Sequence, residues 1–410
     1  MNNFRRLLGF ARSPLYRRVL PAAIGGFGTY MLLQADPSNF LRGGVTFSRN
    51  FASFPIMTTQ AEAKFKCQDL VVSEDKTNGL FLILHIHPTA SPHECIKALQ
   101  KLQAHIDRVS PVDIRDEDSE IIMSIAFGAD FLSKVYPDAV SKGVEPYPFN
   151  ERKGKSSLMP ATGGDILIHA ACGEKGKLFE LVQAVLGDMP EKAVQRVEEV
   201  YGFVYRNGRD LSGFIDGSKI DMNLVADCPE IYLIPSLLHF VAIGTENPAD
   251  EDERIEVAVS SKTGGSYVLT QRWIHDLRKI ATESEKAMEA HIGRTRPDSI
   301  EIKPVQPTSH VGRMTHGLSE EAAEERRIVR HSMPYGEASR ECGLFFIAYA
   351  KSPETLDWML DRMAGLTHDS IEDALFHFTR PVTGAYFYSP SKAELEEIFA
   401  KMGHKRGGLW

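Results

Sequence analysis

The stretch GLFLILHIHPTASPHECIKALQKLQAHI, residues 79–106, begins with an apolar run, turns at a segment that contains proline, and continues with helical spacing. Ser91 is placed to cap the helix, Pro92 occupies its first turn, and Glu94 is positioned for a capping box. The pattern predicts a strand, a turn and a helix. A second strand is predicted where an acidic connection leads into EIIMSIAFG at residues 120–128.

The same plan recurs near the C-terminus. GLFFIAYAKSPETLDWMLDRMAGL, residues 343–366, has Ser352 and Pro353 at the cap and is followed by an apolar run at 384–389. A strand–helix–strand unit repeated about 260 residues apart indicates a tandem duplication of a ferredoxin-like half. We therefore expect an N-terminal half at residues 61–205 and a C-terminal half at residues 206–410.

The chain between these units offers further elements. Strands are predicted at 166–172 and 265–274, each followed by a helix, and the charged residues 245–256 are interpreted as a surface loop. The predicted fold class is α+β, with tandem ferredoxin-like halves in which antiparallel sheets are covered by flanking helices.

Composition narrows the function classes. The 410 residues are 43% apolar and 25% charged, which is typical of a globular protein. The net charge is −8, and no basic stripe interrupts the acidic body, so we expect no nucleic-acid binding. The five cysteines are widely separated and form no CxxC pair, which argues against a disulfide framework and a structural zinc site.

The N-terminal segment has a different character. Residues 1–61 contain seven arginines, no lysine and a single acid, and their apolar run at 20–33 is shorter than the roughly 20 residues of a membrane-spanning helix. We interpret residues 1–60 as a cleaved mitochondrial targeting segment. A plastid transit peptide and a signal anchor are the alternatives, and any membrane contact is expected only through this segment.

The motif GFIDG at residues 213–217 places a lone carboxylate, Asp216, after the apolar pair Phe214 and Ile215. Burying an acid costs free energy unless it has a partner or a chemical role. The glycines on either side would let the backbone bend tightly or approach a ligand. A turn with a solvated aspartate is the simpler interpretation of the motif alone.

Several motifs in one order carry a family resemblance. They are GFIDG, PTSHVGR at 307–313, RRIVRHSMPYGE at 326–337, GRTRPDSIEI at 293–302 and MPATGGDILIHA at 159–170. From about residue 65 to 400 the chain resembles a dye-decolorizing peroxidase, closest to the bacterial B-type branch. This resemblance implies a fold of the dimeric α+β barrel type. The resemblance implies one haem b per chain, reduction of hydrogen peroxide, and one-electron oxidation of a small organic donor such as a dye or a phenol.

The resemblance also implies roles for individual residues on the proximal side. His310 falls at the position of the axial haem ligand, which leaves the other face of the iron open to peroxide. Asp373 aligns with the acid that hydrogen-bonds this histidine and makes it more electron-donating. The neighbouring Glu372 is an alternative for that partner.

On the distal side, Asp216 corresponds to the acid that moves a proton between the two peroxide oxygens. Gly217 and Ser218 beside it are expected to contact the haem. Arg330 corresponds to the distal arginine, whose fixed charge would stabilise the negative charge on the departing oxygen and hold a propionate.

The chain departs from the family pattern at two places. Ser332 stands where B-type relatives usually have asparagine, after His331, which is either a second base or an exposed or propionate-contacting residue. Lys219 and Ile220 stand where the family commonly has an acid and an asparagine. Phe346 is expected either to line the haem wall or to belong to an ordinary strand core.

Two tryptophans, Trp273 and Trp358, suit either an electron relay or aromatic core packing. Two other functions remain open at this stage. One is a haem-binding or haem-handling protein with little peroxidase turnover, and the other is a non-haem member of the same superfamily. Assembly into a homo-oligomer also remains open.

Overall fold

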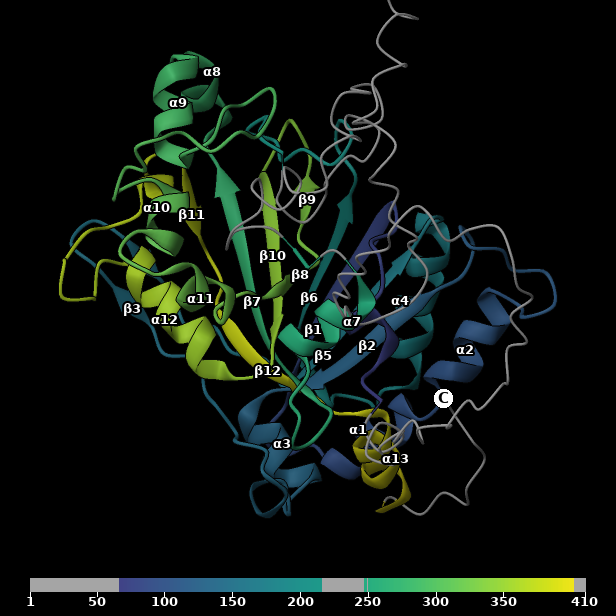
Figure 1. Ribbon diagram of the computed structural model, residues 1–410. Coiled ribbons are helices and arrows are strands. Elements are labelled where there is room, and N and C mark those ends of the chain that lie inside the picture. The colour runs from purple at the N-terminus through teal and green to yellow at the C-terminus, as the bar shows by residue number, and fades with distance from the viewer. Residues whose placement is uncertain (1–65, 216–246, 249, 402–410) are drawn as a thin grey trace, which may run out of the picture. The chain divides into compact units, whose positions relative to one another are not determined.

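The computed structural model describes residues 66–215, 247–248 and 250–401. Two groups of four strands, one from each half of the chain, make up most of a single sheet (Figure 1). The N-terminal group consists of β1 (Asn78–Ile86), β2 (Ile122–Phe127), β5 (Ile166–Cys172) and β6 (Val194–Phe203). The C-terminal group consists of β7 (Ser266–His275), β9 (Met333–Gly336), β10 (Cys342–Ala350) and β12 (Ala385–Ser389).

The sheet closes on itself. Because β7 pairs with both β10 and β12, the strands form a ring in the order β7, β12, β2, β5, β1, β6, β9 and β10, and every pairing is antiparallel. The short strands β8 (Val329–Arg330) and β11 (Thr379–Pro381) extend it, and β3 (Arg152–Lys153) pairs with β4 (Leu158–Met159) in a separate ribbon. This arrangement confirms the predicted α+β fold with two ferredoxin-like halves.

Helices cover the outer faces of this ring. In Figure 1, α2 and α4 lie beside the N-terminal strands, and α10, α11 and α12 lie beside β7. The α-helices are α1 (Pro92–Leu99), α2 (Leu102–Val109), α3 (Ala129–Val135), α4 (Lys175–Asp188), α7 (Glu251–Ala258), α8 (Leu277–Thr282), α9 (Glu285–Ile292), α10 (His310–Thr315), α11 (Glu320–Glu324), α12 (Pro353–Met363) and α13 (Lys392–Lys401). Short 3₁₀ turns occur at η3 (Asp69–Val71), η4 (Val140–Lys142) and η6 (Ala374–His377).

Local sequence signals account for the repeated unit. The Ser91 hydroxyl accepts a hydrogen bond from the backbone N–H of Glu94 at 3.4 Å, and the Ser352 hydroxyl accepts one from Glu354 at 3.2 Å. Each bond satisfies a donor that the first turn of a helix otherwise leaves unpaired. The caps were predicted from the sequence, although the first helix is divided into α1 and α2.

The prediction of a surface loop at 245–256 was wrong for its second part, which forms α7. The Asp250 carboxylate accepts a hydrogen bond from the N–H of Glu253 at 2.9 Å, and three further acids follow in the first turn. Negative charge at this end of a helix is favourable. Val257 and Ala258 at the other end are buried, so packing also holds the helix in place.

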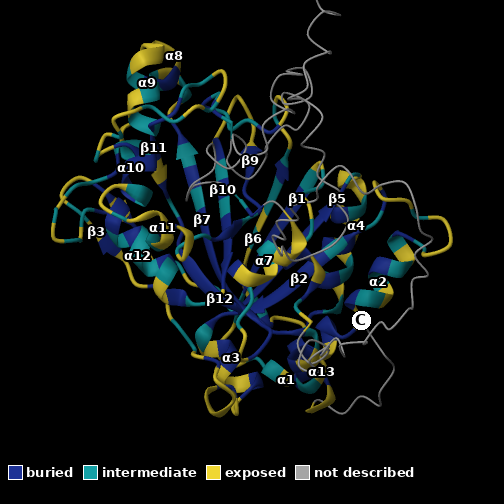
Figure 2. Ribbon diagram, in the orientation of Figure 1, coloured by how far each residue is buried: buried dark blue, intermediate teal, exposed yellow. Residues whose placement is uncertain are grey.

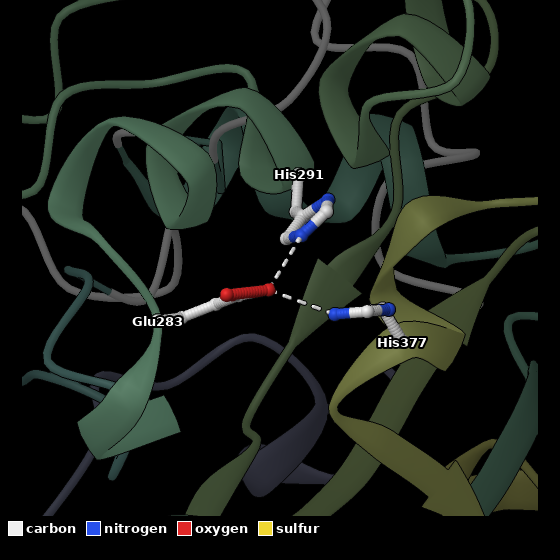
Figure 3. Close-up of side chains that lie close together, drawn as sticks. All are labelled: Glu283, His291 and His377. Atoms are coloured by element: carbon white, nitrogen blue, oxygen red, sulfur yellow. Dashed lines mark hydrogen bonds and ion pairs between the residues drawn. The ribbon is translucent and has the colours of Figure 1, made fainter. Parts of the chain in front are cut away.

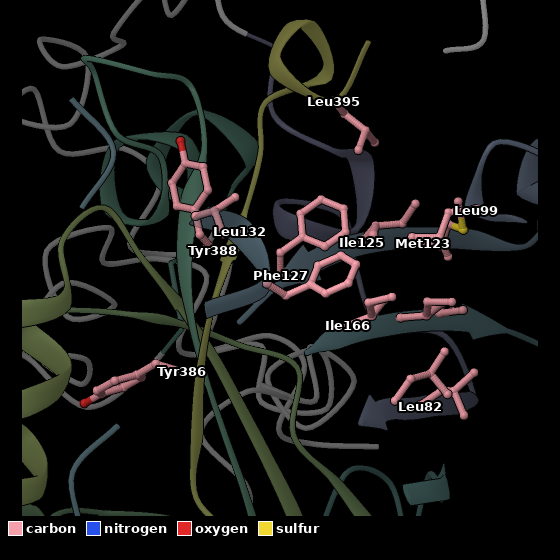
Figure 4. Close-up of a cluster of buried hydrophobic side chains, with 14 of the residues drawn as sticks. Leu82, Leu99, Met123, Ile125, Phe127, Leu132, Ile166, Tyr386, Tyr388 and Leu395 are labelled. Carbon is pink, nitrogen blue, oxygen red and sulfur yellow. The ribbon is translucent and has the colours of Figure 1, made fainter. Parts of the chain in front are cut away.

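The core has two layers because side chains alternate along each strand. On β1, Leu80, Leu82 and Leu84 join the larger cluster beneath the helices, whereas Phe81 and Ile83 join a second cluster. Figure 4 shows part of the larger cluster, where Leu82, Ile125 and Ile166 come from three neighbouring strands. Most strands of the ring are correspondingly buried along their length, whereas β6 is mostly half-buried or exposed (Figure 2). Within the described ranges, no helix has the length and apolar character needed to cross a membrane.

Candidate functional site

A cavity of about 220 Å³ opens among β7, β10, α10 and α12. All of its lining residues are numbered between 210 and 379, so they come from the predicted C-terminal half. Apolar side chains make up most of its wall, and they include Leu269, Val311, Leu344, Met359 and Leu360. Such a chamber suits a large, mostly apolar ligand that is held by a few polar groups.

His310 lies in this wall at the first turn of α10. The hydroxyl of Ser309 caps the helix by accepting a hydrogen bond from the N–H of Gly312 at 3.1 Å, which fixes where the helix begins. The Nδ1 atom of His310 lies 2.7 Å from Oδ2 of Asp373. The imidazole edge that carries Nε2 therefore remains for another ligand, and 32% of the side chain is exposed.

Asp373 is held from two sides. Its side chain is fully buried, and its second oxygen, Oδ1, accepts a hydrogen bond from the N–H of Leu375 at 2.9 Å, which caps η6. Glu372 points elsewhere: its carboxylate accepts hydrogen bonds from the backbone N–H groups of Ser156 and Ser157 at 3.0 and 2.9 Å. Of the two acids that the sequence offered, only Asp373 contacts His310.

Arg330 and Ser332 line the same cavity. The backbone of Arg330 is fixed by Asn247, whose side chain accepts from its N–H at 2.8 Å and donates to its carbonyl at 2.7 Å. The buried Ser332 hydroxyl accepts a hydrogen bond from the N–H of Ile347 at 3.3 Å. The sequence analysis missed Asn247. It follows Glu246, so an acid–asparagine pair of the kind expected at positions 219 and 220 occurs later in the chain.

His331 does not reach the cavity. It is buried, its Nδ1 lies 2.7 Å from the Asp75 carboxylate, and its Nε2 lies 3.3 Å from the carbonyl oxygen of Val71. The expectation of an exposed or propionate-contacting histidine was therefore wrong. Because side chains alternate along an extended backbone, His331 points away from the side that carries Arg330 and Ser332.

The motif GFIDG is described only in part. Phe214 and Ile215 line the cavity, and Gly213 has a φ of +87°, a left-handed conformation that favours glycine. Asp216, Gly217 and Ser218 lie outside the described residues. The chain thus approaches the cavity immediately before Asp216.

The predicted aromatic residues fall in two places. Phe346 and Trp273 both line the cavity, the first from β10 and the second from β7. Trp358 lies on α12 outside the lining set, where the guanidinium groups of Arg326 and Arg362 stand 4.8 and 5.1 Å from its ring centre.

An aspartate–histidine pair that the sequence analysis also missed lines this cavity. The Nε2 atom of His275 lies 3.0 Å from Oδ1 of Asp210, and its Nδ1 lies 2.7 Å from the Thr379 hydroxyl. Burial alone would raise the pKa of Asp210, but His275 and Ser212 outweigh it and lower the pKa to about 2. Asp210 precedes GFIDG by only three residues, which is the signal that could have revealed it.

The lining residues fit a haem group. Haem iron is commonly bound by a histidine whose other ring nitrogen hydrogen-bonds to a carboxylate. His310 has this arrangement, because Nδ1 contacts Asp373 and Nε2 does not. The apolar wall suits the porphyrin faces, and Arg294 and Arg330 supply cationic side chains that suit the propionates. A third lining arginine, Arg327, already pairs with Glu253 and Glu324.

Comparisons with known proteins agree with this chemistry. Family models described as the N-terminal and C-terminal parts of Dyp-type peroxidase match residues 68–204 and 236–394. A dye-decolorizing peroxidase of Mycobacterium tuberculosis is 30% identical over 307 residues, which cover 74% of this chain and 81% of the relative.

Solved structures give the same result. A dye-decolorizing protein of V. cholerae is 31% identical and aligns with a TM-score of 0.63, covering 80% of this chain and 98% of that one. A DypB variant of Rhodococcus jostii RHA1 in complex with heme is 27% identical, with a TM-score of 0.66 and coverage of 80% and 97%.

The comparisons correct the location inferred from residues 1–60. The relatives named above come from bacteria, which have no mitochondria or plastids. This finding contradicts the mitochondrial assignment and its plastid alternative. Arginine-rich composition alone was an insufficient signal, and the segment lies outside the described residues.

Proposed function

The chain belongs to the Dyp-type peroxidase family and is a haem peroxidase, and from this premise we propose which of its residues perform each part of the reaction. The single observation that carries the proposal is the 2.7 Å contact between Nδ1 of His310 and Asp373 at the wall of the apolar cavity. A haem-handling protein with little turnover is not favoured, because the curated relatives are themselves dye-decolorizing peroxidases.

His310 would hold the haem iron through Nε2, the ring nitrogen that does not contact Asp373. Asp373 accepts a hydrogen bond from Nδ1–H of His310, and this bond selects one tautomer and orients the ring. The buried carboxylate also increases the electron density that the imidazole supplies. Phe346 and the other apolar residues of the wall exclude water from the porphyrin faces.

The haem, when bound, supplies the two-electron reduction of peroxide and the one-electron steps that return it to its resting state. Asp216 accepts the proton of one peroxide oxygen and returns it to the other. The position of Phe214 and Ile215 in the cavity wall supports this role, because the next residue of the chain is Asp216. Gly217 and Ser218 follow it in the sequence and would contribute to binding the cofactor.

Arg330 and Ser332 act beside this acid. The guanidinium group of Arg330 stabilises negative charge on the oxygen that departs, and Asn247 fixes the backbone that presents it. Ser332 donates a hydrogen bond to peroxide or to a water molecule, with a shorter reach than an asparagine would have. The electron donor is a small organic molecule such as a dye or a phenol. The position of Trp273 in the cavity wall supports a role in electron transfer, although its burial also fits ordinary core packing.

The roles are tested with three variants of the full chain expressed with haem precursor. His310→Ala is expected to lose the Soret band, while His316→Ala, on the exposed end of the same helix, retains it. Asp216→Asn is expected to keep the Soret band but to slow the spectral change that follows rapid mixing with peroxide. A Soret band that survives His310→Ala would refute the ligand assignment, and an unchanged rate in Asp216→Asn would remove that acid from the mechanism.

A further inference from the structure

A second group of metal-binding side chains lies outside the haem cavity. Glu283 follows α8, His291 lies in the last turn of α9, and His377 ends η6. Figure 3 shows the three side chains converging, with both histidine rings directed at one carboxylate. Nothing in the peroxidase mechanism uses these residues.

The geometry is that of a ligand set. Nε2 of His377 lies 2.9 Å and Nε2 of His291 lies 3.9 Å from the same oxygen, Oε1 of Glu283. One ligand atom from each residue lies within 4.8 Å of the other two. Ligands bound to zinc at about 2.0–2.1 Å in a tetrahedron are about 3.4 Å apart, so small side-chain movements would complete the site.

One atom of the group is unsatisfied. Nε2 of His291 is buried and has no hydrogen-bond partner among the described residues, because 3.9 Å is too long for a hydrogen bond. The His291 and His377 rings also stand only 4.7 Å apart, centre to centre. A buried polar atom without a partner calls for an explanation, and an ion that accepts its lone pair supplies one.

We propose that Glu283, His291 and His377 bind a divalent first-row transition-metal ion. Two imidazoles and one carboxylate suit zinc and its neighbours in the series, whereas calcium and magnesium require more oxygen ligands than this group offers. All three side chains are partly exposed, so the ion reaches the site from solvent and keeps water on its remaining positions.

Such an ion would join elements that are separate in sequence. It would link the connection between α8 and α9 to η6, the turn that Asp373 caps at its other end. Ile292 and Phe378, which follow His291 and His377, both line the haem cavity. The ion would therefore stabilise the part of the cavity wall that contains Ile292 and Phe378. The haem roles proposed above do not depend on this ion.

The test is a zinc titration of the haem-loaded full chain after treatment with a chelator. We expect one equivalent of Zn²⁺ to bind per chain with micromolar or tighter affinity. Calorimetry gives the stoichiometry, and competition with a chromophoric chelator gives the affinity. Mn²⁺ is expected to bind at least tenfold more weakly, because imidazole ligands favour the later metals of the series. The Soret absorbance, read throughout, shows that the haem content has not changed.

Substitutions test whether the bound zinc ion is held by Glu283, His291 and His377. His377→Ala and the volume-preserving Glu283→Gln are each expected to weaken zinc binding at least tenfold. His105→Ala is the matched control, because His105 also contacts a carboxylate, Asp188, but has no third ligand in the described part of the chain. The proposal is overturned if the unsubstituted, chelator-treated chain binds no stoichiometric zinc, or if Glu283→Gln and His377→Ala bind it as tightly as His105→Ala.

Discussion

At the scale of single residues, the site depends on the two different partners that the oxygens of one buried carboxylate, Asp373, contact. Oδ2 of Asp373 receives the imidazole of His310, and Oδ1 receives the backbone N–H of Leu375. The second bond prevents the carboxylate from turning, so the first is held in one direction. A histidine that is oriented in this way needs no reorganisation when it binds a cation.

Asp373→Asn tests the charge of this partner without changing its size. The asparagine can still cap η6, but it offers the histidine no negative charge, so the imidazole should donate less electron density to iron. We expect the haem to remain bound and its reduction potential to rise, as measured by spectroelectrochemical titration. Glu372→Gln, at the neighbouring acid, is the control and should leave the potential unchanged; equal potentials in the two variants would contradict the proposed role of Asp373.

At the scale of elements, Glu372 ties the connection between β3 and β4 to the segment before η6. Its carboxylate accepts hydrogen bonds from the backbone and hydroxyl groups of both Ser156 and Ser157. Burial would raise the pKa of Glu372, but these four donors outweigh it and lower the pKa from its ordinary 4.5 to about 2. The acid therefore contributes as a structural anchor rather than as a catalytic group.

A lowered pKa has a defined effect on stability. The ionised form of Glu372 stabilises the folded chain above about pH 4.5, and this contribution is lost as the pH falls towards 2. Glu372→Gln should therefore lower the free energy of unfolding at pH 6 by about 1–2 kcal/mol, and by roughly half as much at pH 3. Urea unfolding followed by circular dichroism measures both values, and an equal loss at the two pH values would refute the assignment.

At the scale of the whole molecule, the ring depends on two seams between the halves. Only one residue pair is in register at each, Phe127 with Tyr388 and Gly202 with Tyr335. A β-carbon added at Gly202 would lie 2.5 Å from Cβ of Met333 on the opposite strand, which is closer than packed atoms tolerate. The absence of a side chain is what lets β6 approach β9.

Gly202→Ala should therefore open or strain this seam. We expect a loss of about 1–3 kcal/mol in the free energy of unfolding, as for other overpacked cores. The control is Gly187→Ala in α4, where an added β-carbon meets nothing within 4 Å and alanine is the better helix former. Thermal unfolding compares the two, and a Gly202→Ala protein as stable as the control would show that the seam is not tightly packed.

Much of the architecture was predictable because its signals are local. Apolar runs bounded by Ser-Pro caps gave β1, β10 and the helices that follow them, since capping and alternation act over a few residues. Local signals failed where composition was ambiguous. The acidic residues before α7 were interpreted as a loop, and the arginine-rich segment at 1–60 was assigned to the wrong destination.

The candidate site was predictable in part. His310, Arg330, Ser332 and Phe346 were chosen from the family resemblance, and all four line one cavity. Their roles stay predictions until they are tested, as do the domain boundaries at 61–205 and 206–410. The pair of Asp210 and His275 was not predicted, because no spacing rule relates two residues that are 65 positions apart.

The order of strands and helices, the caps and the family motifs were determined by the sequence itself, because each depends on neighbours along the chain. The tertiary structure decided that Asp373 rather than Glu372 meets His310, that β7 closes the ring by pairing with β10 and β12, and that Glu283, His291 and His377 converge. These outcomes depend on the direction in which each side chain leaves its element and on how distant elements pack. Neither quantity is contained in local propensity.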